Sequence, residues 1–220
     1  PFNTAANQPC AAPFVAPVCA SRNCLPQPGT AVGLDALSDR LLFRLQYRNF
    51  GSYQAMVANH TVKIGAGVQA GVRWYELRKS GGPWSIYQQG TYAPDADSRW
   101  MASIAMDKFG NIGLGYTVTS STVFPSIRFT GRRNGDPLGV MTIPETTIVA
   151  GTGVQTGTGY RWGDYSSMHL DPTDDWTMWY TNEYIQTTGT ALWRTRIASF
   201  RLPPGVNAFV RGTITNINGG

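Results

Sequence analysis

The pattern of apolar and polar residues along the chain predicts an all-β protein. No stretch keeps apolar residues at a 3.6-residue period for three helical turns, and the nearest candidate, 34–50, alternates at its centre as well as it spirals. Elsewhere, short segments rich in Val, Ile, Tyr, Trp and Thr are separated by Gly, Pro, Thr and Ser at regular spacing. This spacing is typical of antiparallel strands joined by turns.

The strands recur in units of four. We expect the first unit at 42–47, 53–62, 71–78 and 85–92, and the second at 101–107, 112–120, 126–133 and 146–151. The third is expected at 165–171, 177–185 and 192–202, with a fourth strand in 208–215. In each unit the third strand carries an apolar residue followed by arginine, at Arg73, Arg128 and Arg194.

Four antiparallel strands that repeat at about 40 to 65 residues are typical of β-propeller blades. Each blade has two apolar faces and buries them only against its neighbours. A closed propeller needs about four to eight blades, so three blades predict a partial propeller that is completed by more chain, by another chain or by self-association. The alternative is a two-sheet β-sandwich.

Composition agrees with such a fold and divides the chain into three parts. Apolar residues make up 42% and aromatic residues 12%, which excludes disorder, and charged residues are 14%, against about 25% in an ordinary soluble domain. We expect a Pro/Ala-rich, cysteine-containing segment at 1–33, blades at 34–202, and a linker or the start of a following β-domain at 203–220. The ends lead us to expect a piece of a longer exported protein.

The charge distribution and the cysteines limit which binding partners and which cellular compartment we expect. The net charge of +5 comes from scattered arginines with no basic run, so we expect no nucleic-acid partner. No apolar run approaches the roughly 18 residues of a membrane helix, so no membrane span is expected. Cys10, Cys19 and Cys24 predict one disulfide formed in an oxidising compartment, with its pairing open and one thiol left over.

Several segments resemble a known group of proteins. They are 99–111, 125–132, 161–168, 174–184 and 193–200, and they resemble a group of large exported bacterial proteins in which a β-propeller is followed by Ig-like modules. The resemblance implies a secreted, extracellular or cell-surface location but no specific activity. In shape the predicted fold is also similar to sialidase and BNR-repeat propellers. Their Asp-box motif lies between the third and fourth strands of a blade. In this chain only Asp107 and Gly110 match the motif, and they lie between the first and second predicted strands.

The repeated arginines are the first candidate ligand-binding residues. Arg73, Arg128 and Arg194 would form an anion site if they faced a common channel, because a guanidinium binds carboxylates in a bidentate manner. Trp179 and Tyr184 are further candidate ligand-binding residues, because exposed aromatic side chains and arginines are the usual anchors of protein contacts. We favour a structural role for the three arginines, since the same position in every repeat usually performs the same structural task.

Glu183 is the best candidate for a functional acid, because it interrupts an aromatic strand. Asp164 follows the turn at Gly163 and could be its partner, and glycoside hydrolysis needs two such carboxyl groups. The alternative is that Glu183 pairs with an arginine across the strand.

A calcium site is the only cofactor that the sequence raises. Asp171, Asp174 and Asp175 lie in one turn and carry the oxygen ligands that Ca²⁺ prefers, but aspartates at such positions also cap ordinary turns. The two histidines, His60 and His169, have no cysteine near them in the sequence, so we expect no transition-metal site.

These observations favour a non-enzymatic extracellular module with a structural, adhesive or assembly role. Its partners would be other protein chains, the remaining blades of a longer precursor, a glycan, or copies of itself. The alternatives are a sialidase-like, glycan-active hydrolase and a calcium-stabilised, lectin-like module.

Overall fold

The structure, a computed structural model, describes residues 17–202, which form thirteen β-strands and no helix. The all-β prediction is confirmed. The strands are β1 (Leu25–Gln27), β2 (Thr30–Leu34), β3 (Gln46–Asn49), β4 (Gln54–Lys63), β5 (Ala70–Lys79), β6 (Ser85–Tyr92), β7 (Ser98–Met106), β8 (Ile112–Thr119), β9 (Ser126–Arg132), β10 (Ile143–Val149), β11 (Ser167–Leu170), β12 (Met178–Ile185) and β13 (Trp193–Phe200). Within 17–202, no helix long and apolar enough to cross a membrane is found.

Three larger sheets follow one another along the chain. The first has the order β3-β4-β5-β6, the second β7-β8-β9-β10 and the third β11-β12-β13, and all neighbouring strands are antiparallel. The strands expected in the three repeat units within 17–202 are confirmed, with ends displaced by a few residues. The fourth strand expected at 208–215 lies outside the described residues.

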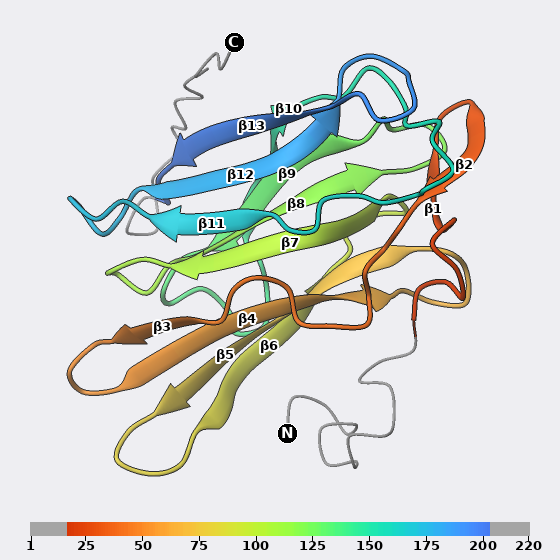
Figure 1. The fold of residues 1–220 in the computed structure, drawn as a ribbon. Helices are drawn as coiled ribbons and strands as arrows, with labels where there is room; N and C mark the ends of the chain where they lie inside the picture. The colour runs from red at the N-terminus through yellow and green to blue at the C-terminus, as the bar shows by residue number, and fades with distance from the viewer. Residues whose placement is uncertain (1–16, 203–220) are drawn as a thin grey trace.

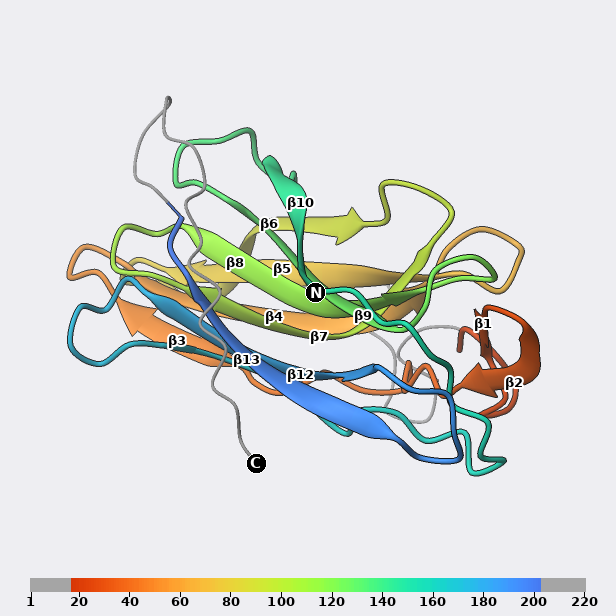
Figure 2. The ribbon, with the colours of Figure 1, turned by 90° about the horizontal axis from the view of Figure 1, so that it is seen from above.

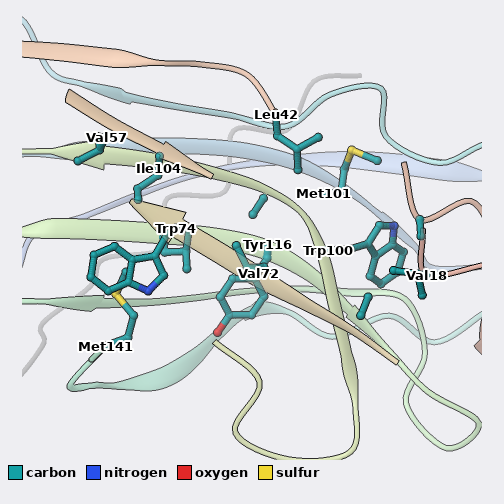
Figure 3. Packing of buried hydrophobic residues seen from close by; sticks show 14 of the residues in the cluster. Val18, Leu42, Val57, Val72, Trp74, Trp100, Met101, Ile104, Tyr116 and Met141 are labelled. Atoms are coloured by element: carbon teal, nitrogen blue, oxygen red, sulfur yellow. The ribbon is translucent and has the colours of Figure 1, made fainter. Parts of the chain in front are cut away.

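The three sheets are stacked as layers, with the second sheet between the first and the third (Figure 1). Each interface has its own apolar core. Between the first and second sheets, Trp74 of β5 packs with Ile104 of β7 and Tyr116 of β8 (Figure 3). Between the second and third sheets, the rings of Phe129 and Phe200 stack with centroids 4.0 Å apart.

Strand β8 shows how the sequence separates these two cores. Its large apolar residues, among them Leu114 and Tyr116, alternate with Gly113 and Gly115. The glycines face the third sheet, and a Cβ atom at Gly115 would lie 2.5 Å from the ring of Tyr180. The missing side chains therefore let the third sheet approach the second closely.

An ionic cluster around the buried guanidinium of Arg99 ties the strands of the second sheet together. The Glu145 carboxylate of β10 accepts hydrogen bonds from Arg99 of β7 at 2.7 Å, from Tyr116 of β8 at 2.6 Å and from Arg128 of β9 at 2.7 Å. Burial alone would raise the pKa of Glu145, but these hydrogen bonds outweigh it and the pKa is lowered.

The first part of the chain contributes a small hairpin that the sequence did not predict. β1 pairs with β2, and Leu25 and Leu34 are buried in the core of the first two sheets. A disulfide joins Cys19 and Cys24 just before it, whereas Cys10 lies outside the described residues. Figures 1 and 2 both place the hairpin at one end of the stack of sheets.

Candidate functional site

The structure brings Glu183 and Asp164 into one pocket of about 450 Å³. The pocket lies where β12 ends and β13 begins, beside the segment 155–164 that leads from β10 to β11. We call this segment the glycine-rich loop, since it holds Gly157, Gly159 and Gly163. Trp193, the first residue of β13, also lines the pocket, and its side chain is 53% exposed.

The glycine-rich loop is held by contacts with distant parts of the chain. Gln27 of β1 exchanges two hydrogen bonds with the backbone of Gln155, at 2.8 and 3.0 Å. The indole of Trp162 is buried and donates to Thr117 Oγ1 of β8 at 3.2 Å. The loop is therefore fixed to both the β1–β2 hairpin and the second sheet.

Two residues of this loop have a backbone conformation that favours glycine. Tyr160 has a φ of 59° and Asp164 a φ of 47°. Such left-handed residues cost about 1–3 kcal/mol each and tend to gather at binding sites. Between them, Gly163 has no room for a side chain, because Met101 packs against its α-carbon.

The carboxylate of Glu183 is bound to the loop rather than to an arginine. Its Oε1 accepts a hydrogen bond of 2.7 Å from the backbone N–H of Gly163. Burial raises the pKa of Glu183, the Gly163 hydrogen bond lowers it, and the charge of Asp164 raises it further; the net shift is upward. Within residues 17–202 no arginine forms an ion pair with Glu183, and Thr195 stands opposite it on β13.

The rest of the pocket has little free positive charge. Among residues 17–202, Arg161 is the only arginine that lines it, and its guanidinium is paired with the carboxylate of Asp164. Since the charges of Arg161 and Asp164 offset each other, the carboxylate of Glu183 gives the pocket a net negative charge. The lining thus combines an exposed indole, two carboxylates and the polar backbone of the loop.

The three repeated arginines do not come together. Arg73 donates to Thr91 on the first sheet, Arg128 donates to Glu145 on the second, and Arg194 lies on β13 of the third. Each guanidinium is thus in a different layer.

The two aromatic candidates on β12 differ in exposure. Tyr184 is buried in the core between the second and third sheets. Trp179 is partly exposed on the opposite face of β12, and its Nε1 donates to Asp171 Oδ2 at 2.9 Å.

The three aspartates proposed for calcium each have other partners. Asp171 accepts from Thr173 and Trp179, Asp174 accepts from Thr177 and pairs with Arg201, and Asp175 pairs with Arg48 at the β3 strand. No group of three or more potential metal-binding side chains is found in the described part of the chain.

The histidines are placed in different sheets. His60 is fully buried on β4, where its ring stacks on Tyr75 and burial lowers its pKa to about 4. His169 lies on β11, and burial also lowers its pKa.

Sequence reasoning missed Trp193, Trp162 and Arg161 as parts of the site. A signal for Arg161 and Trp162 is present, because three glycines in seven residues surround them, whereas nothing near Trp193 in the sequence marks it. No family model, no curated protein and no solved structure matches this chain.

Proposed function

We propose that this protein is a non-catalytic, extracellular adhesive module that binds an uncharged glycan in the pocket beside the glycine-rich loop. The observation that carries the proposal is the exposed indole of Trp193 next to the carboxylates of Glu183 and Asp164 in one pocket.

The chemistry of this lining suits a sugar. A sugar ring has an apolar face of C–H groups and a rim of hydroxyl groups, so it can pack on an indole and donate to acceptors beside it. Trp193 offers a large apolar surface, and a carboxylate accepts hydrogen bonds that are stronger than those between neutral groups. A few polar groups in a concave site are enough to orient such a ligand.

The charge of the pocket favours an uncharged sugar over an acidic one. An acidic sugar needs a free guanidinium, but Arg161 is already paired with Asp164. Arg73 and Arg128 lie on the other two sheets, and Arg194, next to Trp193, alternates onto the other face of β13. The negative charge of Glu183 would repel a second carboxylate. This argues against recognition of sialic acid.

The architecture supports an assembly role around this site. We propose that the three stacked sheets are blades of a propeller, and that remaining blades of a longer precursor, other chains or copies of this chain complete it. The order of strands in each sheet and the face-to-face stacking support this interpretation. The Cys19–Cys24 disulfide supports an oxidising, extracellular location.

Calorimetric titration with a panel of oligosaccharides tests the binding function. The panel contains uncharged oligomers of glucose, xylose, mannose and N-acetylglucosamine together with sialyllactose and oligogalacturonate. We expect binding of at least one uncharged oligomer, no binding of the acidic ones, and a loss of about tenfold or more in Trp193→Ala. Tyr47→Ala, which removes an equally exposed aromatic ring from the first sheet, is the control. Binding of only acidic sugars, or unchanged binding by Trp193→Ala, would reject the proposal.

A glycan-active hydrolase is the second candidate, and the raised pKa of Glu183 beside Asp164 favours it. A carboxyl group that stays protonated nearer to neutral pH can serve as a general acid. Release of nitrophenol from a panel of nitrophenyl glycosides distinguishes the two functions. Turnover by the wild type that disappears in Glu183→Gln would establish an enzyme, whereas binding without turnover supports the adhesive module.

A further inference from the structure

The pocket continues into the exposed face of the third sheet. Residues of β12 alternate between the two faces: Met178 and Tyr180 are buried in the core beneath, so Trp179 and Thr181 project from the outer side. The strand register adds the residues of β13 that stand beside them. We define the platform as Trp179, Thr181, Trp193, Thr195, Ile197 and Ser199.

The platform residues carry two indoles, one aliphatic side chain and hydroxyl groups, and the charged group beside them on the same face of β12 is Glu183, which is opposite Thr195 and accepts the Gly163 N–H at the pocket end. The two arginines of β13, Arg194 and Arg196, alternate onto the opposite face, and Arg196 lies over the ring of Tyr184. Of the platform residues, Ile197 is the one exposed aliphatic side chain, at 43%. An uncharged, hydroxyl-rich polymer matches these groups, because its rings can pack on the indoles and its hydroxyl groups can pair with the threonines and the serine.

The two indoles stand at opposite ends of the platform. Trp193 is opposite Ile185 and Trp179 is opposite Ser199, six positions further along the paired strands. At the usual rise of a β-strand the two positions are about 20 Å apart. Ile197, opposite Thr181, lies between them. This span is several sugar rings long.

We infer that the ligand is an extended, uncharged polysaccharide, one end of which occupies the pocket against Trp193 while the chain crosses the platform to Trp179. This inference rests on the proposed function of the pocket and names the class of glycan. The hydrogen bond from Trp179 Nε1 to Asp171 fixes the edge of the far indole before the ligand arrives, so less side-chain freedom is lost on binding.

The test compares chain lengths. Disaccharides and hexasaccharides of the β-1,4-linked glucose, xylose, mannose and N-acetylglucosamine series are titrated calorimetrically into the full chain. We expect the wild type to bind one hexasaccharide about tenfold or more tighter than its disaccharide. Trp179→Ala should remove this gain and leave disaccharide binding unchanged, whereas Trp193→Ala should weaken both. Tyr47→Ala is again the control.

A second variant keeps the test decisive if Trp179→Ala does not fold. Ile197→Arg changes an exposed residue in the middle of the platform, and its longer side chain should block the polymer and remove the same gain.

Other results would reject the platform, or both the platform and the pocket. Equal affinities for the two lengths, or hexasaccharide binding that neither Trp179→Ala nor Ile197→Arg changes, would overturn the platform and leave the pocket proposal standing. Absence of binding at both lengths would overturn both. If sedimentation instead shows a dimer of the wild type that Ile197→Arg dissociates, the platform is a contact between copies and the inference is wrong.

Discussion

Replacing Trp162 should both destabilise the protein and release the glycine-rich loop. Its indole is 1% exposed, packs against Trp100 with centroids 6.1 Å apart, and donates to Thr117 Oγ1 at 3.2 Å. Truncation of a buried tryptophan to alanine costs about 3–5 kcal/mol. The Thr117 hydroxyl keeps a 3.0 Å hydrogen bond from Asn182, so it is not left unpaired. We therefore expect Trp162→Ala to lower the free energy of unfolding by about 3–4 kcal/mol, near the lower limit of that range.

A matched variant separates packing from hydrogen bonding. Trp162→Phe keeps most of the buried ring and loses the N–H donor, so its cost should be about 1–2 kcal/mol. For a chain of this size, 1 kcal/mol corresponds to about 2–4 °C in Tm, which gives Trp162→Ala a decrease of about 6–16 °C.

Urea unfolding and hydrogen exchange of the loop amides measure the two effects. Exchange should accelerate across 155–164 in Trp162→Ala. If Trp162→Ala lowers the free energy of unfolding by less than about 1 kcal/mol, or leaves the loop amides as protected from exchange as in the wild type, Trp162 does not anchor the pocket.

Three other changes test the fold and the site. Glu145→Gln should cost about 1.5–3 kcal/mol in urea unfolding at neutral pH, because Arg99 and Arg128 lose a charged hydrogen-bond partner while Arg99 keeps its pair with Asp95. The lowered pKa of Glu145 means that its contribution is present above the ordinary glutamate range, so the difference should vanish as the pH falls through the lowered pKa. Gly115→Ala should cost about 1–3 kcal/mol in the same assay, since the new Cβ meets the Tyr180 ring. Glu183 has a raised pKa, so the native state binds the extra proton and wild-type stability falls as the pH rises through that pKa; Tm profiles of Glu183→Gln should lack this fall.

The sequence predicted the larger sheets well because the strands follow a local rule. In β12, apolar Met178 and Tyr180 alternate with residues of the other face, and this pattern is visible without any long-range information. The β1–β2 hairpin escaped prediction because β1 has only three residues and includes Pro26. Its stability comes from burying Leu25 and Leu34 against sheets that lie far away in the sequence.

The candidate site could be predicted only in part. Glu183 was found because a carboxylate within an aromatic strand is unusual, and Asp164 because it follows a glycine turn. The contribution of Trp162 depends on a hydrogen bond to Thr117, 45 residues away in the sequence, and that of Trp193 on where the glycine-rich loop folds back. Such contacts leave no periodic signal in the chain.

The repeated arginines illustrate the opposite case, in which a clear pattern does not define a site. Arg73, Arg128 and Arg194 occupy equivalent strands, yet each is in a separate layer and has its own surroundings. Equivalent positions in stacked sheets are displaced by the thickness of a layer, about 10 Å, so a repeated position does not by itself bring side chains together.

A crystal structure of the protein with the tightest-binding uncharged oligosaccharide of the panel would show where the glycan binds. We expect a sugar ring packed on the indole of Trp193, with a hydroxyl group donating to the carboxylate of Glu183. A sugar bound elsewhere on the molecule, with the pocket beside the glycine-rich loop containing only solvent, would contradict this expectation.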